Sequence, residues 1–125
     1  SDFKILNYKK NKIKKDMKIN LEIEKNVDIL SYLSTHNSLR PKLVIGFAAE
    51  TNDVLKNAQE KIYKKHCDWI IANDVSKKDI GFNSDFNEVS IIYSDKDKKI
   101  DFISKRNKSE IAEEITDKIV KNFSN

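Results

Sequence analysis

Leu43-Val44-Ile45-Gly46-Phe47-Ala48-Ala49-Glu50-Thr51-Asn52 is an apolar run that ends abruptly in an acid, a hydroxyl and an amide. A run that is apolar at every position and contains β-branched residues is typical of a strand covered on both faces, as in parallel sheets. The polar residues fall at its C-terminal end, where α/β sheets bind ligands. This stretch therefore predicts an α/β fold and the position of a site.

The residues after this run predict a βαβ unit. A helix is expected from about Asn52 to about His66, with Asn52 as its N-cap. The next apolar run, Cys67–Ala72, is a second buried strand and ends in Asn73-Asp74. Strand, helix and strand at this spacing bring the polar ends of both strands to one edge of a sheet. The helix positions expected to pack on the sheet are Val54, Leu55, Ala58 and Ile62.

Shorter elements are expected on either side of this unit. Residues 89–93 and 100–102 alternate in polarity around a turn, which predicts a hairpin at the edge of the sheet. A final amphipathic helix is expected from Lys108 to Phe123, with Ile111, Ile115, Ile119 and Val120 inward. Upstream, Ser1–Ile5 is predicted to be the end of a strand, Ile19–Ile23 a short strand and Val27–Leu33 a short helix.

Composition limits the class of protein. The chain has 125 residues, 38% of them hydrophobic and 35% charged, which indicates a globular domain or part of one. No stretch approaches the roughly 18 apolar residues of a membrane span, so a membrane partner is not expected. Cys67 is the single cysteine and no secretory leader is evident, so we expect a reducing, cytoplasmic location.

Basic residues concentrate between Lys9 and Lys18, where Asp16 is the only acid among six lysines. Such a segment attracts phosphate, although charge runs are usually solvated loops. A basic nucleic-acid binder would rest on this segment alone, because acids and bases are interleaved along most of the chain. No specific nucleic-acid partner is therefore expected.

Several side chains keep two interpretations open. Lys61 and Lys65 lie about 40° apart on a helical wheel, where they either extend their ammonium groups to water or bind an anion. Phe47 either packs in the core or stacks on a base. Asp2, after the end of a predicted strand, is expected at the same edge of the sheet, where it either binds a hard cation carried by phosphates or caps a turn. The polar residues at the two strand ends either orient a ligand or cap loops: Glu50, Asn73 and Asp74.

Four segments in register resemble one family. They are Lys12-Ile13-Lys14-Lys15, Gly46–Asn52, Ala72-Asn73-Asp74-Val75-Ser76, and Gly81–Asp85 with Asn87. Their order and spacing are similar to the C-terminal part of phosphopantothenoylcysteine synthetase, the phosphopantothenate–cysteine ligase of coenzyme A biosynthesis. The resemblance covers essentially all 125 residues.

The resemblance implies a Rossmann-like three-layer αβα sandwich, here incomplete, with a C-terminal edge hairpin and a final helix. It implies activation of the carboxylate of 4'-phosphopantothenate by CTP as an acyl-cytidylate, from which cysteine displaces CMP. Mg²⁺ or another divalent cation assists. A homodimer is expected, as is fusion to or association with a flavin-dependent decarboxylase. The sequence shows no Ser or Cys dyad with His36 or His66, and this chemistry needs no protein nucleophile.

Site residues follow from the resemblance position by position. Lys12 resembles the active-site lysine of the Lys-x-Lys-Lys loop, and Asp2 the aspartate near the triphosphate and metal. The CTP contacts are carried over to Val27, Asp28, Ile29, Leu30, Phe47, Lys61 and Lys65. Val27 stands where the family often has proline.

The family's Gly-rich motif and an asparagine associated with the acyl-cytidylate belong upstream of these segments. Residues 1–125 are therefore expected to be the C-terminal part of a single ligase domain whose N-terminal part is absent, and to be inactive alone. The alternative is a non-catalytic nucleotide-binding or interaction module with the same fold.

Overall fold

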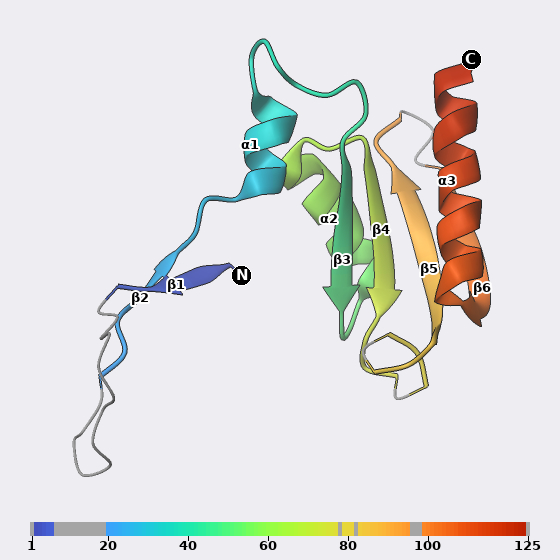
Figure 1. Ribbon diagram of the computed structural model, residues 1–125, viewed down its shortest axis with the longest axis horizontal. Helices are drawn as coiled ribbons and strands as arrows, with labels where there is room; N and C mark the ends of the chain where they lie inside the picture. Colours follow the sequence, from blue (N-terminus) through green and yellow to red (C-terminus); the bar gives the residue numbers. More distant parts are fainter. Residues whose placement is uncertain (1, 7–19, 78, 82, 96–98, 125) are drawn as a thin grey trace.

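The computed structural model describes residues 2–6, 20–77, 79–81, 83–95 and 99–124 (Figure 1). Within these residues the chain forms a four-stranded sheet with strand order β3-β4-β5-β6 and a separate two-stranded sheet. The smaller sheet pairs β1 (Phe3–Ile5) with β2 (Ile23–Lys25) in antiparallel register. A strand was expected over Ile19–Ile23, but β2 begins at Ile23, where its pairing with Ile5 begins.

The expected βαβ unit is confirmed. β3 (Ile45–Glu50) and β4 (Trp69–Asp74) are parallel, and α2 (Val54–Lys65) connects them. Their register runs from Ile45 opposite Trp69 to Glu50 opposite Asp74, so both strands end together. The polar residues that follow the two buried runs therefore lie at one edge of the sheet, as the sequence predicts.

The C-terminal hairpin and helix also form as predicted. β5 (Phe86–Tyr93) pairs antiparallel with β4 on one side and with β6 (Ile100–Asn107) on the other. α3 (Lys108–Ser124) follows β6 directly. A short helix, α1 (Ile29–Thr35), precedes β3 and contacts α2.

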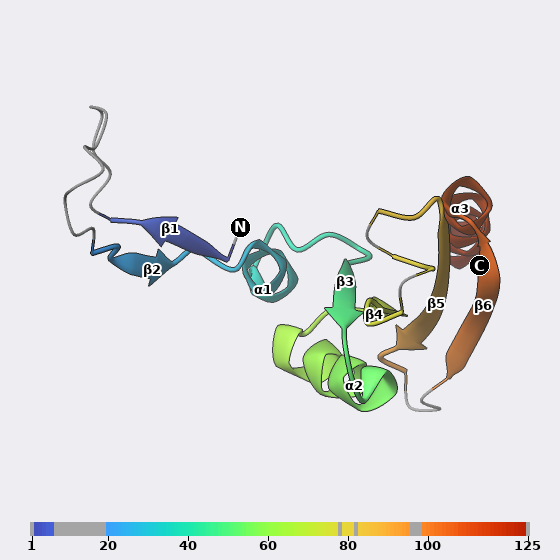
Figure 2. The ribbon, with the colours of Figure 1, turned by 90° about the horizontal axis from the view of Figure 1, so that it is seen from below.

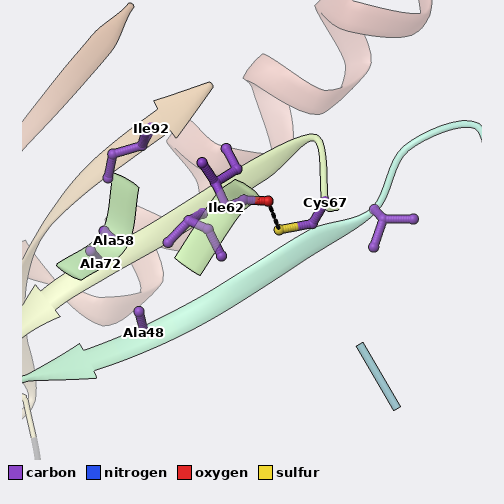
Figure 3. Packing of buried hydrophobic residues seen from close by; sticks show 8 residues of the cluster. Ala48, Ala58, Ile62, Cys67, Ala72 and Ile92 are labelled. Atoms are coloured by element: carbon purple, nitrogen blue, oxygen red, sulfur yellow. Dashed lines mark hydrogen bonds between the residues drawn. The ribbon is translucent and has the colours of Figure 1, made fainter. Parts of the chain in front are cut away.

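Helices cover both faces of the four-stranded sheet, which confirms the three-layer architecture (Figure 2). α2 packs on one face, where Cys67 directs its thiol toward the Ile62 carbonyl at 4.0 Å (Figure 3). Burial raises the pKa of the Cys67 thiol. The buried cluster on this face comprises Val44, Ala48, Ala58, Ile62, Cys67, Ile70, Ala72 and Ile92. α3 covers the other face, with a cluster of Trp69, Ile71, Val89, Ile91, Ile103 and Ile111.

Three local expectations are wrong. Leu55 and Val120 are exposed, because each follows an inward residue by one position and so lies about 100° around its helix. The N-cap of α2 is Asp53 rather than Asn52. Asp53 has a left-handed backbone with φ 45° and makes no side-chain capping bond. Its carbonyl instead accepts the first helical hydrogen bond, from the Asn57 amide at 2.9 Å.

Candidate functional site

Lys61 and Lys65 each bind a carboxylate from another element. The ammonium of Lys61 lies 3.0 Å from Oε1 of Glu50, at the end of β3. The ammonium of Lys65 pairs with Asp28, at the start of α1. The two lysines are therefore ion-paired rather than simply extended into water. Lys61 and Lys65 also lie on the face of α2 that meets β3 and α1, which places two cations beside the first strand of the sheet.

Asp28 joins the start of α1 to the end of α2. Its side chain is the N-cap of α1 and accepts a hydrogen bond from the Ser31 amide at 3.0 Å. The hydrogen bond from Lys65, together with that from Ser31, holds the pKa of Asp28 below its usual value. Buried Ser34 adds a second connection by donating its hydroxyl to the Lys65 carbonyl. Asp28 and Lys65, two of the predicted CTP contacts, are thus brought into direct contact.

Gly46 allows α1 to approach β3 closely. A Cβ atom at Gly46 would lie 2.6 Å from Leu30 Cδ2 and 2.8 Å from Ile70 Cδ1. Leu30 therefore packs into the space that a side chain on β3 would occupy, and it joins the cluster beneath α2. The neighbouring predicted contacts Val27 and Ile29 are exposed. Of the segment 27–30, Asp28 and Leu30 thus secure α1, while Val27 and Ile29 face solvent.

Phe47 lies on the opposite face of β3 from the two lysines. Side chains alternate along a strand, and Phe47 shares its face with Ile45, which packs against the α3-side cluster. Its side chain is 72% exposed, so the expectation that it packs in the core is wrong. The ring borders a cleft of about 300 Å³ between the sheet and α3. It is thus accessible to a ligand, although it does not share a face with Lys61 or Lys65.

The cleft beside Phe47 includes Asn73, which the sequence offered as a ligand-orienting residue, and further side chains that sequence reasoning did not assign to a site. Asn73 and Asn87 line it, with the Asn73 Nδ2 atom 3.5 Å from the Asn87 Oδ1 atom. Lys108, the first residue of α3, and Thr116 complete its polar lining. Asn73 and Asn87 occur within the motifs singled out above. No sequence signal links them to Lys108, because only the packing of α3 on the sheet places it there.

The ends of the two parallel strands serve different purposes. Asp74 accepts hydrogen bonds from the Ser76 hydroxyl at 2.6 Å and the Ser76 amide at 2.9 Å. These bonds lower the pKa of Asp74 and close the turn after β4. Glu50 instead accepts from side chains of α2. Asp74 is thus a loop cap, and Glu50 connects the strand to the helix that carries the candidate lysines.

Asp2 lies apart from these residues. We expected it at the C-terminal edge of the main sheet, but Asp2 immediately precedes β1, which belongs to the two-stranded sheet. Its carbonyl accepts a hydrogen bond from the Asn26 amide at 2.9 Å. Within the described ranges, no group of three or more His, Cys, Asp or Glu side chains could hold a metal ion. The role of Asp2 at a cation carried by phosphates stays a prediction. Lys12 lies outside the described residues.

The fold and the site define a three-layer α/β protein with cations beside the first strand of its main sheet and a cleft at the polar end of that sheet. The chain matches the model of the DNA/pantothenate metabolism flavoprotein C-terminal domain over residues 1–123. It belongs to that family.

Curated relatives carry a common name. The chain is 38% identical over 102 residues to the coenzyme A biosynthesis bifunctional protein CoaBC of Escherichia coli K12, which covers 78% of this chain and 25% of that protein. It is 39% identical over 119 residues to the CoaBC protein of Borreliella burgdorferi, which covers 92% of this chain and 28% of the relative. The chain therefore spans less than a third of the length of these two relatives.

Solved structures share the fold. The crystal structure of the C-terminal domain of a coenzyme A biosynthesis bifunctional protein CoaBC aligns with a TM-score of 0.65 and 32% identity, covering 83% of this chain and 45% of that one. The DNA/pantothenate metabolism flavoprotein of Streptococcus pneumoniae aligns with a TM-score of 0.57 and 23% identity, over 80% of this chain and 42% of that one. In the described part of the chain, no helix is both long and apolar enough to span a bilayer.

Proposed function

We propose that this chain supplies the C-terminal part of a CTP-dependent phosphopantothenate–cysteine ligase domain in coenzyme A biosynthesis. The family match over residues 1–123 is the observation that carries the proposal. Relatives named for coenzyme A biosynthesis, at 38% and 39% identity, support it. The four motifs that resemble the ligase lie within the matched range.

In the proposed reaction, the carboxylate of 4'-phosphopantothenate attacks the α-phosphate of CTP and releases pyrophosphate. The amine of cysteine then displaces CMP from the acyl-cytidylate and forms the amide. Both steps build negative charge on phosphate oxygens, which positioned cations stabilise. Lys61 and Lys65 are the cations proposed to contact CTP, and exposed Phe47 offers a ring face for the base.

The roles of Lys12 and of the divalent cation are part of the same proposal. Lys12 is proposed to be the active-site lysine. Mg²⁺ supplies charge neutralisation when it arrives with the triphosphate. Since Asp2 has no neighbouring group of metal ligands among the described residues, we assign the cation to the nucleotide and derive no step through a protein-bound metal.

The assembly is proposed from three observations. The solved CoaBC domain is matched over only 45% of its length, which supports a ligase domain completed by further sequence. The strands of the two-stranded sheet expose Phe3, Ile5 and Ile23, and exposed apolar surface of this kind favours a partner, here a second copy. The word bifunctional in the relatives' names supports association with a flavin-dependent decarboxylase.

Calorimetric titration tests the nucleotide part of the proposal. The full-length gene product is titrated with CTP, ATP and a DNA duplex. CTP is expected to bind, and the double variant Lys61→Ala, Lys65→Ala is expected to bind it at least tenfold more weakly. The matched control is Lys99→Ala with Lys105→Ala. It removes the same charge from β6 and from the residue just before it, and should change the CTP affinity little. Binding of DNA in place of CTP would contradict the proposal.

Pyrophosphate release tests the reaction and the completeness of the chain. The full-length gene product is expected to release pyrophosphate only with CTP and 4'-phosphopantothenate, and to form the amide when cysteine is added. The 125-residue chain alone is expected to release none. Turnover by the chain alone would refute the proposal that it is incomplete. CTP binding without turnover by the full-length product would favour a non-catalytic module.

A further inference from the structure

Glu50 occupies the last position of β3, on the side of the sheet that faces α2. Its side chain is 16% exposed, so its carboxylate is largely withdrawn from water. Both oxygens are engaged by α2. Oε1 accepts a hydrogen bond from the Lys61 ammonium at 3.0 Å, and Oε2 accepts one from the side-chain amide of Asn57 at 3.3 Å. The carboxylate is therefore fixed in orientation by two donors spaced one helical turn apart.

This contact determines where the Lys61 ammonium lies. A lysine side chain has four flexible methylene groups, and without a partner its charge samples many positions. Glu50 holds it over the end of β3, with the Lys61 side chain still 35% exposed. An ammonium has three N–H donors, and the bond to Glu50 uses one of them. The lysine can therefore keep its carboxylate and still donate to an anion.

We propose that Glu50 is a positioning residue that presents the Lys61 ammonium to the phosphates of the nucleotide, an inference that rests on the proposed function. Protein kinases use the same physical arrangement, in which a glutamate from a neighbouring element holds a phosphate-binding lysine. The arrangement reduces the conformational entropy that the lysine side chain loses when the nucleotide binds. Glu50 itself touches no nucleotide.

A competing role for Glu50 predicts the opposite change in CTP affinity. If Glu50 competed with phosphate for Lys61, removal of its charge would release the lysine and tighten CTP binding. The positioning role predicts weaker CTP binding, because the loss of the carboxylate releases the Lys61 ammonium from its position. Repulsion between Glu50 and the phosphates is small in this role, since the carboxylate faces α2 and is bound by Asn57 and Lys61. The direction of the change in CTP affinity therefore separates the two roles.

The experiment measures the CTP dissociation constant of the full-length gene product by calorimetry. Glu50→Gln is expected to weaken CTP binding by roughly threefold to tenfold, the net size of one ordinary hydrogen bond. In a Lys61→Met background, Glu50→Gln should cause no further change. The matched control is Glu88→Gln, which removes the carboxylate of the Lys77–Glu88 ion pair. Glu88 lies on β5 and its side chain is 22% exposed, similar to that of Glu50, so this variant should leave the dissociation constant unchanged.

Three outcomes would overturn the inference. Unchanged or tighter CTP binding by Glu50→Gln, while Lys61→Met weakens it, removes the positioning role and leaves the proposed function standing. An equal loss in the wild-type and Lys61→Met backgrounds would assign Glu50 a structural role that does not act through Lys61. Absence of CTP binding by the wild type would overturn the proposed function and this inference together.

Discussion

The two sheets of this protein differ in how their strands are held. The four-stranded sheet has a buried cluster on each face, one under α2 and one under α3. All six strand residues of the two-stranded sheet are exposed. Two paired strands without a core are marginally stable in water. Backbone pairing is thus common to both sheets, and among the described residues apolar burial stabilises the larger one.

This difference separates the candidate functional residues into two groups. Phe47, Lys61 and Lys65 lie on elements of the four-stranded sheet unit, and their backbone positions are held by its packing. Asp2 immediately precedes the strand pair, whose six described residues are all exposed. A site that draws on both groups depends on a partner or a ligand to hold the second group in place. Substitutions in each sheet test whether the two sheets differ in stability as their burial indicates.

Truncation of a buried side chain should have the largest effect. Ile91, on β5, is fully buried, whereas Ile23, on β2, is 61% exposed. Ile91→Ala is expected to lower the free energy of unfolding by about 2–5 kcal/mol, because it removes buried methyl groups and leaves a cavity. Ile23→Ala is expected to change it by less than about 0.5 kcal/mol. Urea denaturation measures both, and equal losses would show that the two-stranded sheet has a core of its own.

An added methyl group at Gly46 should have an intermediate effect. The new Cβ atom would overlap Leu30 and Ile70, so Gly46→Ala is expected to cost about 1–3 kcal/mol of unfolding free energy. The cost should be smaller in a Leu30→Ala background, since one of the two overlaps is then absent. Denaturation of the single and double variants gives this coupling. Equal costs in both backgrounds would show that Leu30 does not limit the space above Gly46.

The Asp101 carboxylate should contribute about 1–2 kcal/mol of unfolding free energy. It accepts from Lys118 at 2.8 Å and from the Tyr93 hydroxyl at 2.8 Å, and thereby joins α3 to the sheet. The Lys118 bond lowers the pKa of Asp101, so the folded state favours its ionised form. This contribution is present above the ordinary aspartate pKa of 3.8 and is lost as the pH falls through the lower folded pKa.

Denaturation of Asp101→Asn as a function of pH measures this contribution. The variant is expected to be less stable than the wild type near neutral pH, and the two should converge in acid. Burial, and then the hydrogen bond to the same carboxylate, raise the pKa of Tyr93, so Asp101→Asn should also let the tyrosine ionise at lower pH. A constant difference in stability at all pH values would mean that the loss does not come from ionised Asp101.

An ion pair in the two-stranded sheet should have the smallest effect. Lys4 and Glu24 lie 3.1 Å apart with side chains that are 55% and 53% exposed. Solvent screens such a pair, so Glu24→Gln is expected to change the free energy of unfolding by less than about 0.5 kcal/mol. The comparison with Asp101→Asn is made in the same denaturation experiment. A loss as large as that of Asp101→Asn would indicate that Glu24 is buried in an assembly of the protein.

Much of the fold could be predicted from local patterns. The apolar runs of β3 and β4, the helical spacing on α2 and the alternation on β5 and β6 each follow from residues that are close in sequence. The parallel pairing of β3 with β4 follows as well, because a helix of this length connects them. The errors occur where one position decides the outcome. Asp53 rather than Asn52 caps α2, for example, and Leu55 lies just outside the buried face.

Less of the candidate site could be predicted. Lys61 and Lys65 were identified as a pair from their spacing, and Glu50 and Asp28 were candidates as well, but the ion pairs that join them were not predicted. Phe47 was identified, but not its exposure at a cleft with Lys108. These contacts join residues that are 11 to 61 positions apart in the chain. Spacing along one element carries no information about such distant neighbours.

The sequence by itself determined the class of fold, the elements of the main sheet and the residues that resemble the ligase motifs. Only the tertiary structure decided that Phe47 and Lys61 face opposite sides of β3, that Asp2 lies beside a separate sheet, and that Glu50 holds Lys61. The physical reason is that periodicity sets which side of an element is apolar. Which charged groups then meet depends on how the elements pack.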